Sequence, residues 1–348
     1  MVENDCFDLH GKSILVTGGT GSFGQVFVRR VLEEFEPHRL VILSRDEFKQ
    51  FEMARSVNGP NVRYVVGDVR DEARLARLFA GIDVVVHAAA LKQVPTAEYN
   101  PIECIKTNVL GAENVINAAL DAGVKRVVAL STDKATNPIN LYGATKLCSD
   151  KLFIAANGLS GEDGTRFSVV RYGNVVGSRG SVIPFFEERR ESGMLPITDE
   201  RMTRFWITLE RGAEFVIQVL SMMSRGEIFV PKQPVMRMVD LATAIAPECA
   251  QEIIGIRPGE KIHEVLVPAD EARHTLEFDD FFVVVPAFHE AWGTKPPETY
   301  GGSAGRPVPA GFEYRSNGDA DRLSAAELRA LIYPQASSRI AGPYSHRR

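Results

Sequence analysis

A glycine-rich turn near the amino terminus constrains the fold more than any other feature of this sequence. Three glycines, spaced Gly-x-x-Gly-x-x-Gly between residues 18 and 24, follow a β-branched run at 13–17 and precede a helical pattern. Glycines at this spacing permit a tight turn, let a pyrophosphate approach the backbone and let the helix pack closely on the strand. The helix amino terminus then favours the negative charge. The residues expected to contact such a dinucleotide are Gly18, Gly21, Ser22, Phe23 and Gly24.

Short apolar runs alternate with amphipathic helical patterns through the first half of the chain. Continuous aliphatic runs are typical of strands buried on both faces of a parallel sheet, with helices as the crossovers. We therefore predict an α/β fold with a doubly wound parallel sheet of the Rossmann type. The expected strands are residues 13–17, 40–43, 62–66, 84–87, 126–131 and 167–170.

The pattern changes after about residue 171, where the alternation breaks into shorter segments around a helix-like stretch at 209–223. We predict a smaller, mixed substrate-binding region here. Residues 1–172 are assigned mainly to the nucleotide-binding domain, 173–333 mainly to the interleaved substrate-binding region, and 334–348 to a tail. The Pro- and Gly-rich stretch 286–311 predicts an irregular excursion. Ser324 and Glu327 predict a capping box that opens a final helix.

Composition argues against several classes of function. The 348 residues carry a net charge of −5, whereas a nucleic-acid partner normally requires a basic surface. No apolar run approaches the roughly 18–20 residues that span a bilayer, and the amino terminus lacks the features of a signal peptide. We expect a cytoplasmic protein with no nucleic-acid or membrane partner. Four scattered cysteines without a Cys-x-x-Cys pair predict neither a metal site nor a disulfide framework.

The end of the second expected strand bears on which dinucleotide binds. An enzyme that uses NAD usually has an acidic residue here that reaches the ribose hydroxyls. This chain instead has Ser44 and Arg45, with Lys49 one helical turn further, and a guanidinium suits a 2′-phosphate. Asp46 leaves NAD as the alternative, but we predict NADP. Further cofactor contacts are expected after the third and fourth strands, at Asp68, Val69, Ala88 and Ala89.

A second constellation follows the fifth expected strand. Tyr142 and Lys146 are four residues apart and share one face of a helix. A nearby ammonium favours the phenolate and lowers a phenol's pKa, so Tyr142 is expected to take a hydroxyl proton while hydride leaves the same carbon. At this distance from the glycine turn, the pair predicts a short-chain dehydrogenase/reductase. A surface Tyr–Lys pair without a catalytic role is the alternative.

Asp133 and Lys134 stand between these two constellations and suggest a more specific reaction. Oxidation of a sugar at C4 makes the C5 proton acidic, and elimination then needs a base at C5 and an acid for the hydroxyl that leaves C6. A neighbouring carboxyl and amine at the end of the catalytic strand supply both. Sugar epimerases and simple reductases usually need only a Ser or Thr with the Tyr–Lys pair. The alternative interpretation is a structural ion pair.

Beyond these motifs, residues 10–285 resemble the extended short-chain dehydrogenase/reductases. Among them, the chain is most similar to the short, soluble, C5-inverting UDP-N-acetylglucosamine 4,6-dehydratases of pseudaminic acid biosynthesis. The stretches that carry this resemblance are residues 44–52, 97–101, 131–135, 171–181 and 202–206. The resemblance implies a hydro-lyase that gives UDP-2-acetamido-2,6-dideoxy-beta-L-arabino-hex-4-ulose from UDP-N-acetylglucosamine, with NADP, in a homodimer or hexamer.

The resemblance also implies a role for each motif residue. Asp133 protonates the leaving hydroxyl, Lys134 acts at C5 and Tyr142 acts at the C4 hydroxyl. Thr132 orients the sugar, and Lys146 holds the nicotinamide ribose and tunes Tyr142. Lys92 is implied at both the cofactor and the substrate. The remaining implied substrate contacts are Asn174, Arg179, Arg204, Arg257 and Glu260.

Two positions bear on substrate selectivity and on whether the reaction inverts or retains C5. Gln93 stands where relatives commonly have His, which affects fine selectivity rather than the reaction if this residue touches substrate. The long, membrane-anchored, retaining relatives typically have Met in place of Tyr142, so this chain favours the inverting class. The other interpretations are a UDP-sugar 4-epimerase, which has no evident use for the Asp133–Lys134 pair, and a non-catalytic NADP-binding sensor, which generally lacks the Tyr or the Lys.

Overall fold

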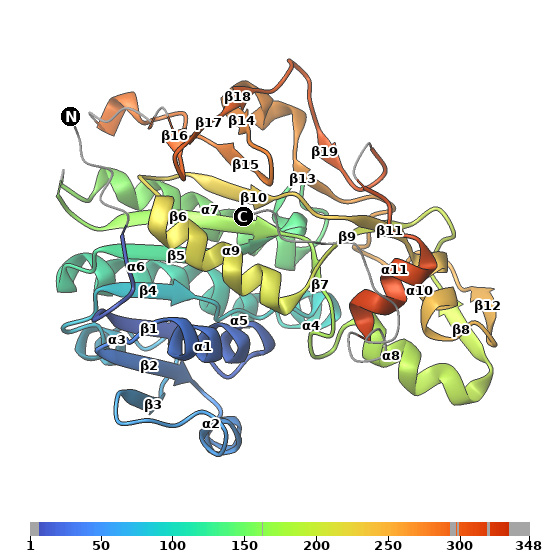
Figure 1. The fold of residues 1–348 in the computed structure, drawn as a ribbon, viewed down its shortest axis with the longest axis horizontal. Helices are drawn as coiled ribbons and strands as arrows, with labels where there is room; N and C mark the ends of the chain where they lie inside the picture. The colour runs from blue at the N-terminus through green and yellow to red at the C-terminus, as the bar shows by residue number, and fades with distance from the viewer. Residues whose placement is uncertain (1–6, 162, 293–296, 298, 319–320, 334–348) are drawn as a thin grey trace.

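A ten-stranded sheet forms the centre of the molecule (Figure 1). Its strand order is β18-β14-β15-β10-β6-β5-β4-β1-β2-β3. The computed structural model describes residues 7–161, 163–292, 297, 299–318 and 321–333. The tail expected at 334–348 and Cys6 lie outside the described residues.

All six predicted strands are present, and they pair in parallel. Their bounds are β1 Ser13–Thr17, β2 Arg39–Ser44, β3 Val62–Val66, β4 Val84–His87, β5 Arg126–Thr132 and β6 Arg166–Tyr172. From β1 the chain winds outward through β2 and β3, then returns to the other side of β1 for β4, β5 and β6. This reversal confirms the doubly wound fold. It also places the switch point, where such folds bind ligands, between β1 and β4.

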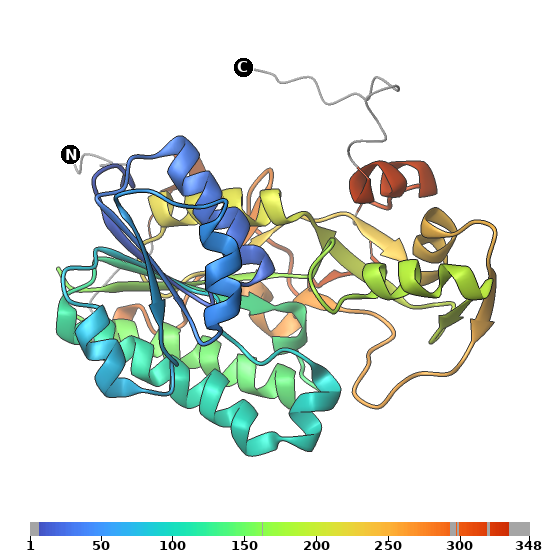
Figure 2. The same cartoon turned by 90° about the horizontal axis from the view of Figure 1, so that it is seen from below.

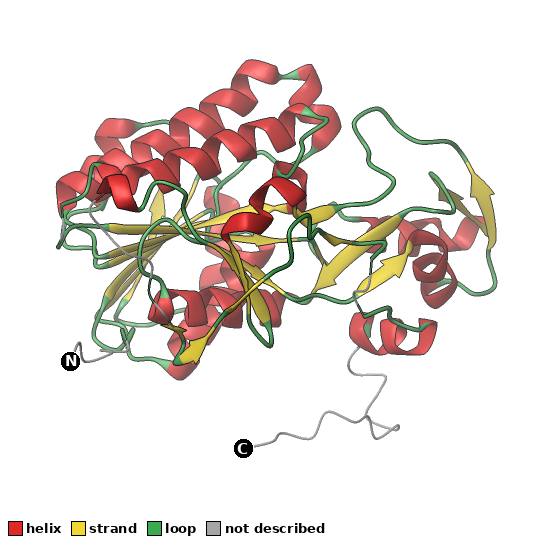
Figure 3. Cartoon of the chain, turned by 90° about the horizontal axis from the view of Figure 1, so that it is seen from above, coloured by secondary structure: helices red, strands yellow, loops and turns green. Residues whose placement is uncertain are grey.

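Helices cover both faces of this sheet (Figures 2 and 3). The pleat of β1 sends Ile14 and Val16 to one face and Leu15 to the other, and all three are completely buried. Burying each such side chain contributes about 1.5–3 kcal/mol. The first face is covered by α1 (Ser22–Glu34) and α9 (Leu209–Met222), and the second by α3 (Glu72–Leu78), α6 (Gly111–Ala122) and α7 (Leu141–Ala155). The helix predicted at 209–223 is thus confirmed as α9.

Short helices connect these layers. A π-helical turn, Lys106–Leu110, leads directly into α6. Turns of this kind often occur at functional sites. Three further short helices lie between β2 and α6 in the chain: α2 (Glu47–Ala54), α4 (Val94–Tyr99) and α5 (Pro101–Ile105).

The second half of the chain completes the main sheet. The strands that do so are β10 (Ile228–Pro231), parallel to β6, and the antiparallel β15 (Phe281–Val284), β14 (Thr275–Glu277) and β18 (Arg306–Pro307). The segment 286–311 is therefore less irregular than predicted, because the backbone of β18 pairs with β14. It also contains β16 (Thr299–Tyr300) and β17 (Ser303–Ala304).

A smaller lobe extends from the sheet, on the right in Figure 1. Its elements are β7 (Asn174–Val175), β8 (Met194–Ile197), β9 (Thr203–Ile207), β11 (Val235–Arg237), β12 (Ala250–Ile253), α8 (Val182–Arg189), α10 (Met238–Ile245) and α11 (Ala325–Ile332). It has a separate apolar core that includes Leu195, Trp206 and Leu241. β13 (Val265–Val267) pairs with β19 (Tyr314–Arg315). The predicted capping box is confirmed at the start of α11, where Ser324 and Glu327 accept each other's backbone N–H.

Within the residues described, none of the helices combines the length and apolar character needed to cross a membrane. That same part of the chain contains no group of three or more His, Cys, Asp or Glu side chains placed to hold a metal ion. Cys104, Cys148 and Cys249 are free thiols.

Candidate active site

A cavity of about 580 Å³ lies where β1, β2, β4, β5 and β6 end. It collects residues from most of the segments that the sequence motifs singled out. The predicted cofactor residues that line it are Gly18, Gly21, Ser22, Phe23, Gly24, Ser44, Arg45, Lys49, Asp68, Val69, Ala88, Ala89, Lys92, Tyr142 and Lys146. The predicted catalytic and substrate residues that line it include Thr132, Lys134, Asn174 and Arg179.

The glycine turn leaves no room for a side chain at two of its positions. Gly18 has a φ of 66°, and a Cβ there would lie 2.8 Å from the backbone nitrogen of Ala89. A Cβ on Gly24 would lie 2.5 Å from the Cα of Gly19, where α1 packs on the turn. Gly21 is the N-cap of α1 and provides no side-chain hydrogen bond to its first turn. The turn therefore offers a close backbone surface and helical N–H groups to an anionic ligand.

At the end of β2, the structure separates the roles of Arg45 and Asp46. Asp46 caps α2, because its Oδ1 accepts the Lys49 N–H at 3.0 Å and its Oδ2 lies 2.7 Å from Lys49 Nζ. The Arg45 guanidinium lines the cavity, and its Nη1 lies 3.8 Å from Asp68 Oδ2. Asp46 also lines the cavity, but its carboxylate is engaged with its own helix, and the Arg45 guanidinium lies beside it at the end of β2, where an NAD enzyme usually presents a carboxylate.

The Tyr–Lys pair lines the same cavity from α7, the helix that follows β5. β5 ends at Thr132, and Asn140 begins α7 by accepting a hydrogen bond from the Gly143 N–H at 2.8 Å. Tyr142 and Lys146 follow one turn apart on α7, and both are buried while lining the cavity. The helical spacing that was expected from the sequence therefore delivers both side chains to one site.

The electrostatics of Tyr142 differ from the expectation. Burial raises the pKa of Tyr142 to about 12, while the Lys134 ammonium and a hydrogen bond with Thr132 act in the opposite direction. Burial also lowers the pKa of Lys146, against the attraction of the Asp150 carboxylate. Lys134, rather than Lys146, is the main cation that opposes the effect of burial on the pKa of Tyr142. The reason is spatial, because the turn after β5 brings Lys134 toward α7.

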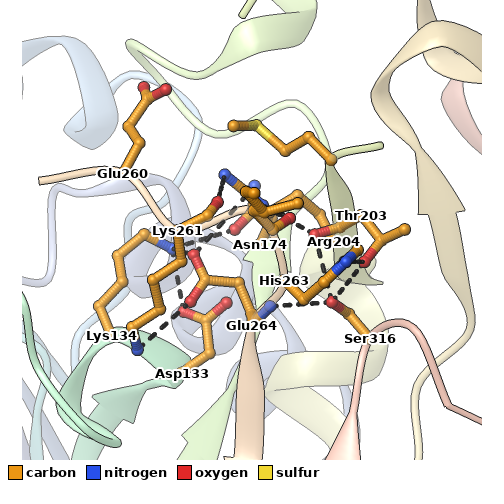
Figure 4. A network of polar contacts seen from close by, with 12 residues as sticks. Asp133, Lys134, Asn174, Thr203, Arg204, Glu260, Lys261, His263, Glu264 and Ser316 are labelled. Atoms are coloured by element: carbon orange, nitrogen blue, oxygen red, sulfur yellow. Dashed lines mark hydrogen bonds and ion pairs between the residues drawn. The ribbon is translucent and has the colours of Figure 1, made fainter. Parts of the chain in front are cut away.

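Lys134 and Asp133 form an ion pair beside the cavity (Figure 4). Lys134 Nζ lies 3.0 Å from Asp133 Oδ1 and 3.7 Å from Glu264 Oε1, and it donates to Asn174 Oδ1 at 3.3 Å. Asp133 Oδ1 also accepts from the Thr132 hydroxyl at 2.8 Å. Asp133 is completely buried and does not line the cavity, whereas Thr132 and Lys134 do. In this conformation Asp133 is connected to the cavity through its contacts with Thr132 and Lys134.

The charge state of Lys134 follows from its neighbours. Burial favours the neutral amine, but the Asp133 and Glu264 carboxylates outweigh this and raise the pKa of Lys134, against repulsion from Arg204. Lys134 is therefore an ammonium at neutral pH. Lys92 also lines the cavity, and its pKa is lowered by burial and by the charge of Lys134.

Three residues assigned to the substrate by resemblance do not line the cavity. Arg204 is buried and donates to the backbone carbonyls of Thr203, Lys261 and Ile262. It therefore holds a loop in place. The Arg257 guanidinium is half exposed, and its Nη1 lies 3.8 Å from Glu260 Oε1. A role for Arg204, Arg257 and Glu260 at the substrate therefore stays a prediction, and none of the three lines the cavity in this conformation.

The sequence did not reveal two charged residues near the Asp133–Lys134 pair. Glu264 lies beside Lys134, and Lys261 Nζ lies 3.7 Å from Glu264 Oε2. Both belong to a charged run, 257–264, whose local pattern says nothing about the end of β5. Gln93, the position that departs from the common pattern, does line the cavity.

Comparison with known proteins gives a consistent result. Residues 14–286 match the family described as "Polysaccharide biosynthesis protein". A protein of Campylobacter jejuni named "UDP-N-acetylglucosamine 4,6-dehydratase (inverting)" is 52% identical over 333 residues, which cover 92% of this chain and 97% of that protein. A protein of Rickettsia conorii named "UDP-glucose 4-epimerase" is 42% identical over 279 residues, which cover 78% of this chain and 82% of that protein.

Two solved structures share the fold. The X-ray structure of Pen from Bacillus thuringiensis is 37% identical, with a TM-score of 0.85, and the match covers 95% of this chain and 99% of that one. DesIV from Streptomyces venezuelae, a dTDP-glucose 4,6-dehydratase with NAD and TYD bound, is 26% identical with a TM-score of 0.65. That match covers 72% of this chain and 86% of DesIV.

The geometry of the glycine turn predicts that Gly18→Ala abolishes binding of the expected dinucleotide. Gly123 is the matched control, because its φ is 67° but nothing lies within 4 Å of a Cβ placed there. Both substitutions strain the backbone by roughly 1–2 kcal/mol, but only Gly18→Ala also drives a methyl group into the backbone of residues 88 and 89. Nucleotide released on denaturation and the melting temperature measure the two effects. Full nucleotide content in Gly18→Ala would contradict this account of the turn.

Proposed function

Because this chain belongs to the polysaccharide biosynthesis protein family, within the extended short-chain dehydrogenase/reductases, we propose that it is a UDP-N-acetylglucosamine 4,6-dehydratase that inverts C5. The observation that carries this proposal is one cavity that presents Tyr142 and Lys146 beside Lys134 and its carboxylate partner Asp133. The relative that shares 52% identity bears the same name. The reaction is a hydro-lyase reaction, with oxidation at C4, loss of water across C5–C6 and reduction at C6.

The proposed cofactor is NADP. A nicotinamide dinucleotide fits the turn at residues 18–24, where the glycines let the turn pack closely on the backbone of residues 88–89 and on α1, and the related structure of DesIV holds NAD. Arg45, Asp46 and Lys49 all line the cavity at the end of β2, and the Asp46 carboxylate is engaged as a helix cap. Two cations in that position suit a 2′-phosphate. When bound, the cofactor accepts hydride from C4 and returns it to C6.

The proposed first step places Tyr142 at the C4 hydroxyl. The phenol takes part as a base, so its proton must leave before it accepts the hydroxyl proton. Because burial raises the pKa of Tyr142 to about 12, the phenolate becomes more populated as pH rises. The Lys134 ammonium and the hydrogen bond with Thr132 oppose the effect of burial and stabilise the phenolate.

The proposed elimination uses Lys134 and Asp133 as a coupled pair. Lys134 rests as an ammonium 3.0 Å from Asp133 Oδ1. Transfer of one proton across this contact leaves a neutral amine and a carboxylic acid. The amine then accepts the C5 proton, and the acid supplies the proton that leaves with the C6 hydroxyl as water. Thr132, whose hydroxyl donates to Asp133 Oδ1 and which lines the cavity, provides the nearest link from that acid to the substrate.

Substrate contacts are proposed at the mouth of the same cavity. Asn174, Arg179 and Lys92 line it, and Lys92 is proposed to contact both the cofactor and the sugar. Arg204, Arg257 and Glu260 do not line it in this conformation and are proposed to support the adjoining lobe instead. We further propose a cytoplasmic homo-oligomer, dimer or hexamer, that carries out the first step of pseudaminic acid biosynthesis.

A UDP-sugar 4-epimerase is the alternative, because relatives bearing the epimerase name reach 42% identity. Epimerisation needs hydride removal and return at C4, for which Tyr142 and Lys146 suffice. The buried Asp133–Lys134 pair has no evident use in that reaction. A non-catalytic sensor is less consistent still with a chain that retains Tyr142 and Lys146 as well as the Asp133–Lys134 pair beside them.

The reaction is tested by incubating the purified protein with UDP-N-acetylglucosamine in deuterated water. We expect a product that has lost one water, carries one solvent deuterium at C5 and has the L-arabino configuration by NMR at early times. Unchanged mass would refute a dehydratase and leave the epimerase or the sensor. A first-formed D-xylo product would refute inversion alone.

Variants of the catalytic pairs should block different steps. Lys134→Ala and Asp133→Asn should each lower the rate of dehydration by about 10²–10⁴-fold, the usual contribution of an acid–base group. The cofactor content should stay normal. Tyr142→Phe should prevent the transient NADPH absorbance that follows mixing with substrate. Stopped-flow absorbance and product mass separate these outcomes. If Lys134→Ala dehydrates at the wild-type rate, the ion pair is structural.

The choice of cofactor is tested at Arg45. Arg45→Asp replaces attraction for a 2′-phosphate with repulsion, so NADP binding should fall much more than NAD binding. Arg63, an exposed arginine outside the cavity lining, provides the control through Arg63→Asp. Equilibrium titration with each nucleotide measures the ratio. Recovery of NAD from the wild-type protein would contradict the assignment.

A further inference from the structure

A cluster of five charged side chains lies beside the cavity, and two of its members, Lys261 and Glu264, were not singled out from the sequence. We call it the charge cluster. Its members are the carboxylates Asp133 and Glu264 and the cations Lys134, Arg204 and Lys261 (Figure 4). Asp133 and Lys134 follow β5, Arg204 lies in β9, and the other two precede β13. The cluster therefore joins the catalytic turn to the later part of the chain.

Glu264 occupies the centre of this cluster. Its side chain is only 3% exposed. Its Oε1 lies 3.7 Å from Lys134 Nζ and 3.8 Å from Arg204 Nε, and its Oε2 lies 3.7 Å from Lys261 Nζ. None of these contacts is at hydrogen-bond distance, and Oε2 is without a hydrogen-bond partner in the described structure. A buried carboxylate held this way interacts with its cations mainly through charge.

The backbone of Glu264 is fixed on its other side. Its N–H donates to Ser316 Oγ at 2.9 Å, and that hydroxyl lies 2.7 Å from Thr203 Oγ. His263 Nδ1 also contacts Thr203 Oγ at 2.8 Å. The carboxylate is therefore presented to Lys134 by a frame of hydrogen bonds that does not depend on Lys134.

We propose that Glu264 is a positioning residue for Lys134, and that its carboxylate shares the Lys134 ammonium with Asp133 and holds that amine at the point where it moves a proton at the sugar. This inference rests on the proposed dehydratase function. Glu264 does not line the cavity, so it acts through Lys134 rather than on the substrate.

The charges around Lys134 determine in which direction the loss of Glu264 shifts the pKa of Lys134. The groups that face it are the carboxylates Asp133 and Glu264, the cations Arg204, Lys261 and Lys92, and the phenol of Tyr142. Two carboxylates therefore compensate Lys134 together with three further cations. Removing the charge of Glu264 leaves Asp133 as the single anion, which lowers the pKa of Lys134 and weakens the pull that keeps its amine beside Asn174.

A merely structural role for Glu264 makes a different prediction. In that case the carboxylate serves only to neutralise Arg204 and Lys261, and its loss lowers stability without changing how activity depends on pH. The pH profile of dehydration separates the two roles, because it reports the ionisation of the group that moves the proton.

The test compares wild type with Glu264→Gln, which keeps the side-chain shape and removes the charge. Glu227→Gln is the matched control, since Glu227 is a buried carboxylate that accepts hydrogen bonds from Ser168 and Tyr300 outside the cavity lining. We expect Glu264→Gln to lower the rate of dehydration by roughly 10–100-fold, less than loss of an acid–base group itself. Its alkaline decline, where the Lys134 ammonium is lost, should begin at lower pH than in wild type. Glu227→Gln should keep the wild-type pH profile.

Product mass and stopped-flow absorbance distinguish a failure of the positioning role of Glu264 from a failure of the proposed dehydratase function. If wild type forms no product lacking water, the dehydratase function fails, whatever Glu264 does. If wild type dehydrates, Glu264→Gln should retain the transient NADPH signal and lose mainly the exchange of deuterium at C5. A wild-type pH profile in a folded Glu264→Gln would overturn the positioning role.

Glu264→Asp covers the case in which Glu264→Gln does not fold. Aspartate keeps the negative charge but withdraws it by one methylene. We expect a slower dehydration with the onset of the alkaline decline close to that of wild type, and melting temperatures and cofactor content will show whether the fold is intact. Dehydration at the wild-type rate in Glu264→Asp would show that the distance between this carboxylate and Lys134 does not matter, and the proposal would be wrong.

Discussion

The parallel pairing of six strands decides where the chemistry of this protein is assembled. In the register of the sheet, Thr17 lies beside both Leu43 and His87, and Thr132 lies beside Tyr172. Parallel strands need crossover connections, so their carboxyl ends meet at one edge and the loops that leave them form one surface. The glycine turn, the end of β2 and the catalytic turn after β5 belong to different parts of the chain but share this edge. The cavity is a consequence of that pairing.

Buried charge is the second constraint, and it extends beyond the sheet. A buried ion costs several kcal/mol unless a partner compensates it. Lys134 is compensated by Asp133, its neighbour in sequence, and by Glu264, which arrives with the segment before β13. Arg204 fixes that segment by donating to its backbone carbonyls. The later part of the chain therefore does more than cover the cavity, because it completes the electrostatic environment of Lys134.

Features set by interactions between residues close in the chain were predicted from the sequence, whereas those set by contacts between distant residues were not. The six parallel strands, α9 and the capping box at Ser324 were predictable because apolar periodicity and cap residues act within a few positions. The edge strand β18 was missed, since a two-residue strand carries no periodic signal. Arg204, Arg257 and Glu260 were assigned by resemblance alone, and charged residues at isolated positions contain no local information about the cavity that they face or avoid.

The sequence by itself determined the glycine turn, the succession of buried strands and helices, and the placement of Tyr142 and Lys146 on one helical face. Each of these depends on residues that are close in the chain, so composition and spacing are sufficient. Only the tertiary structure decided which cation acts on Tyr142 and which carboxylate completes the surroundings of Lys134. Coulomb energy depends on distance in space, and Glu264 stands 130 positions beyond Lys134 in the chain. That contact exists because the fold brings the segment before β13 to the end of β5.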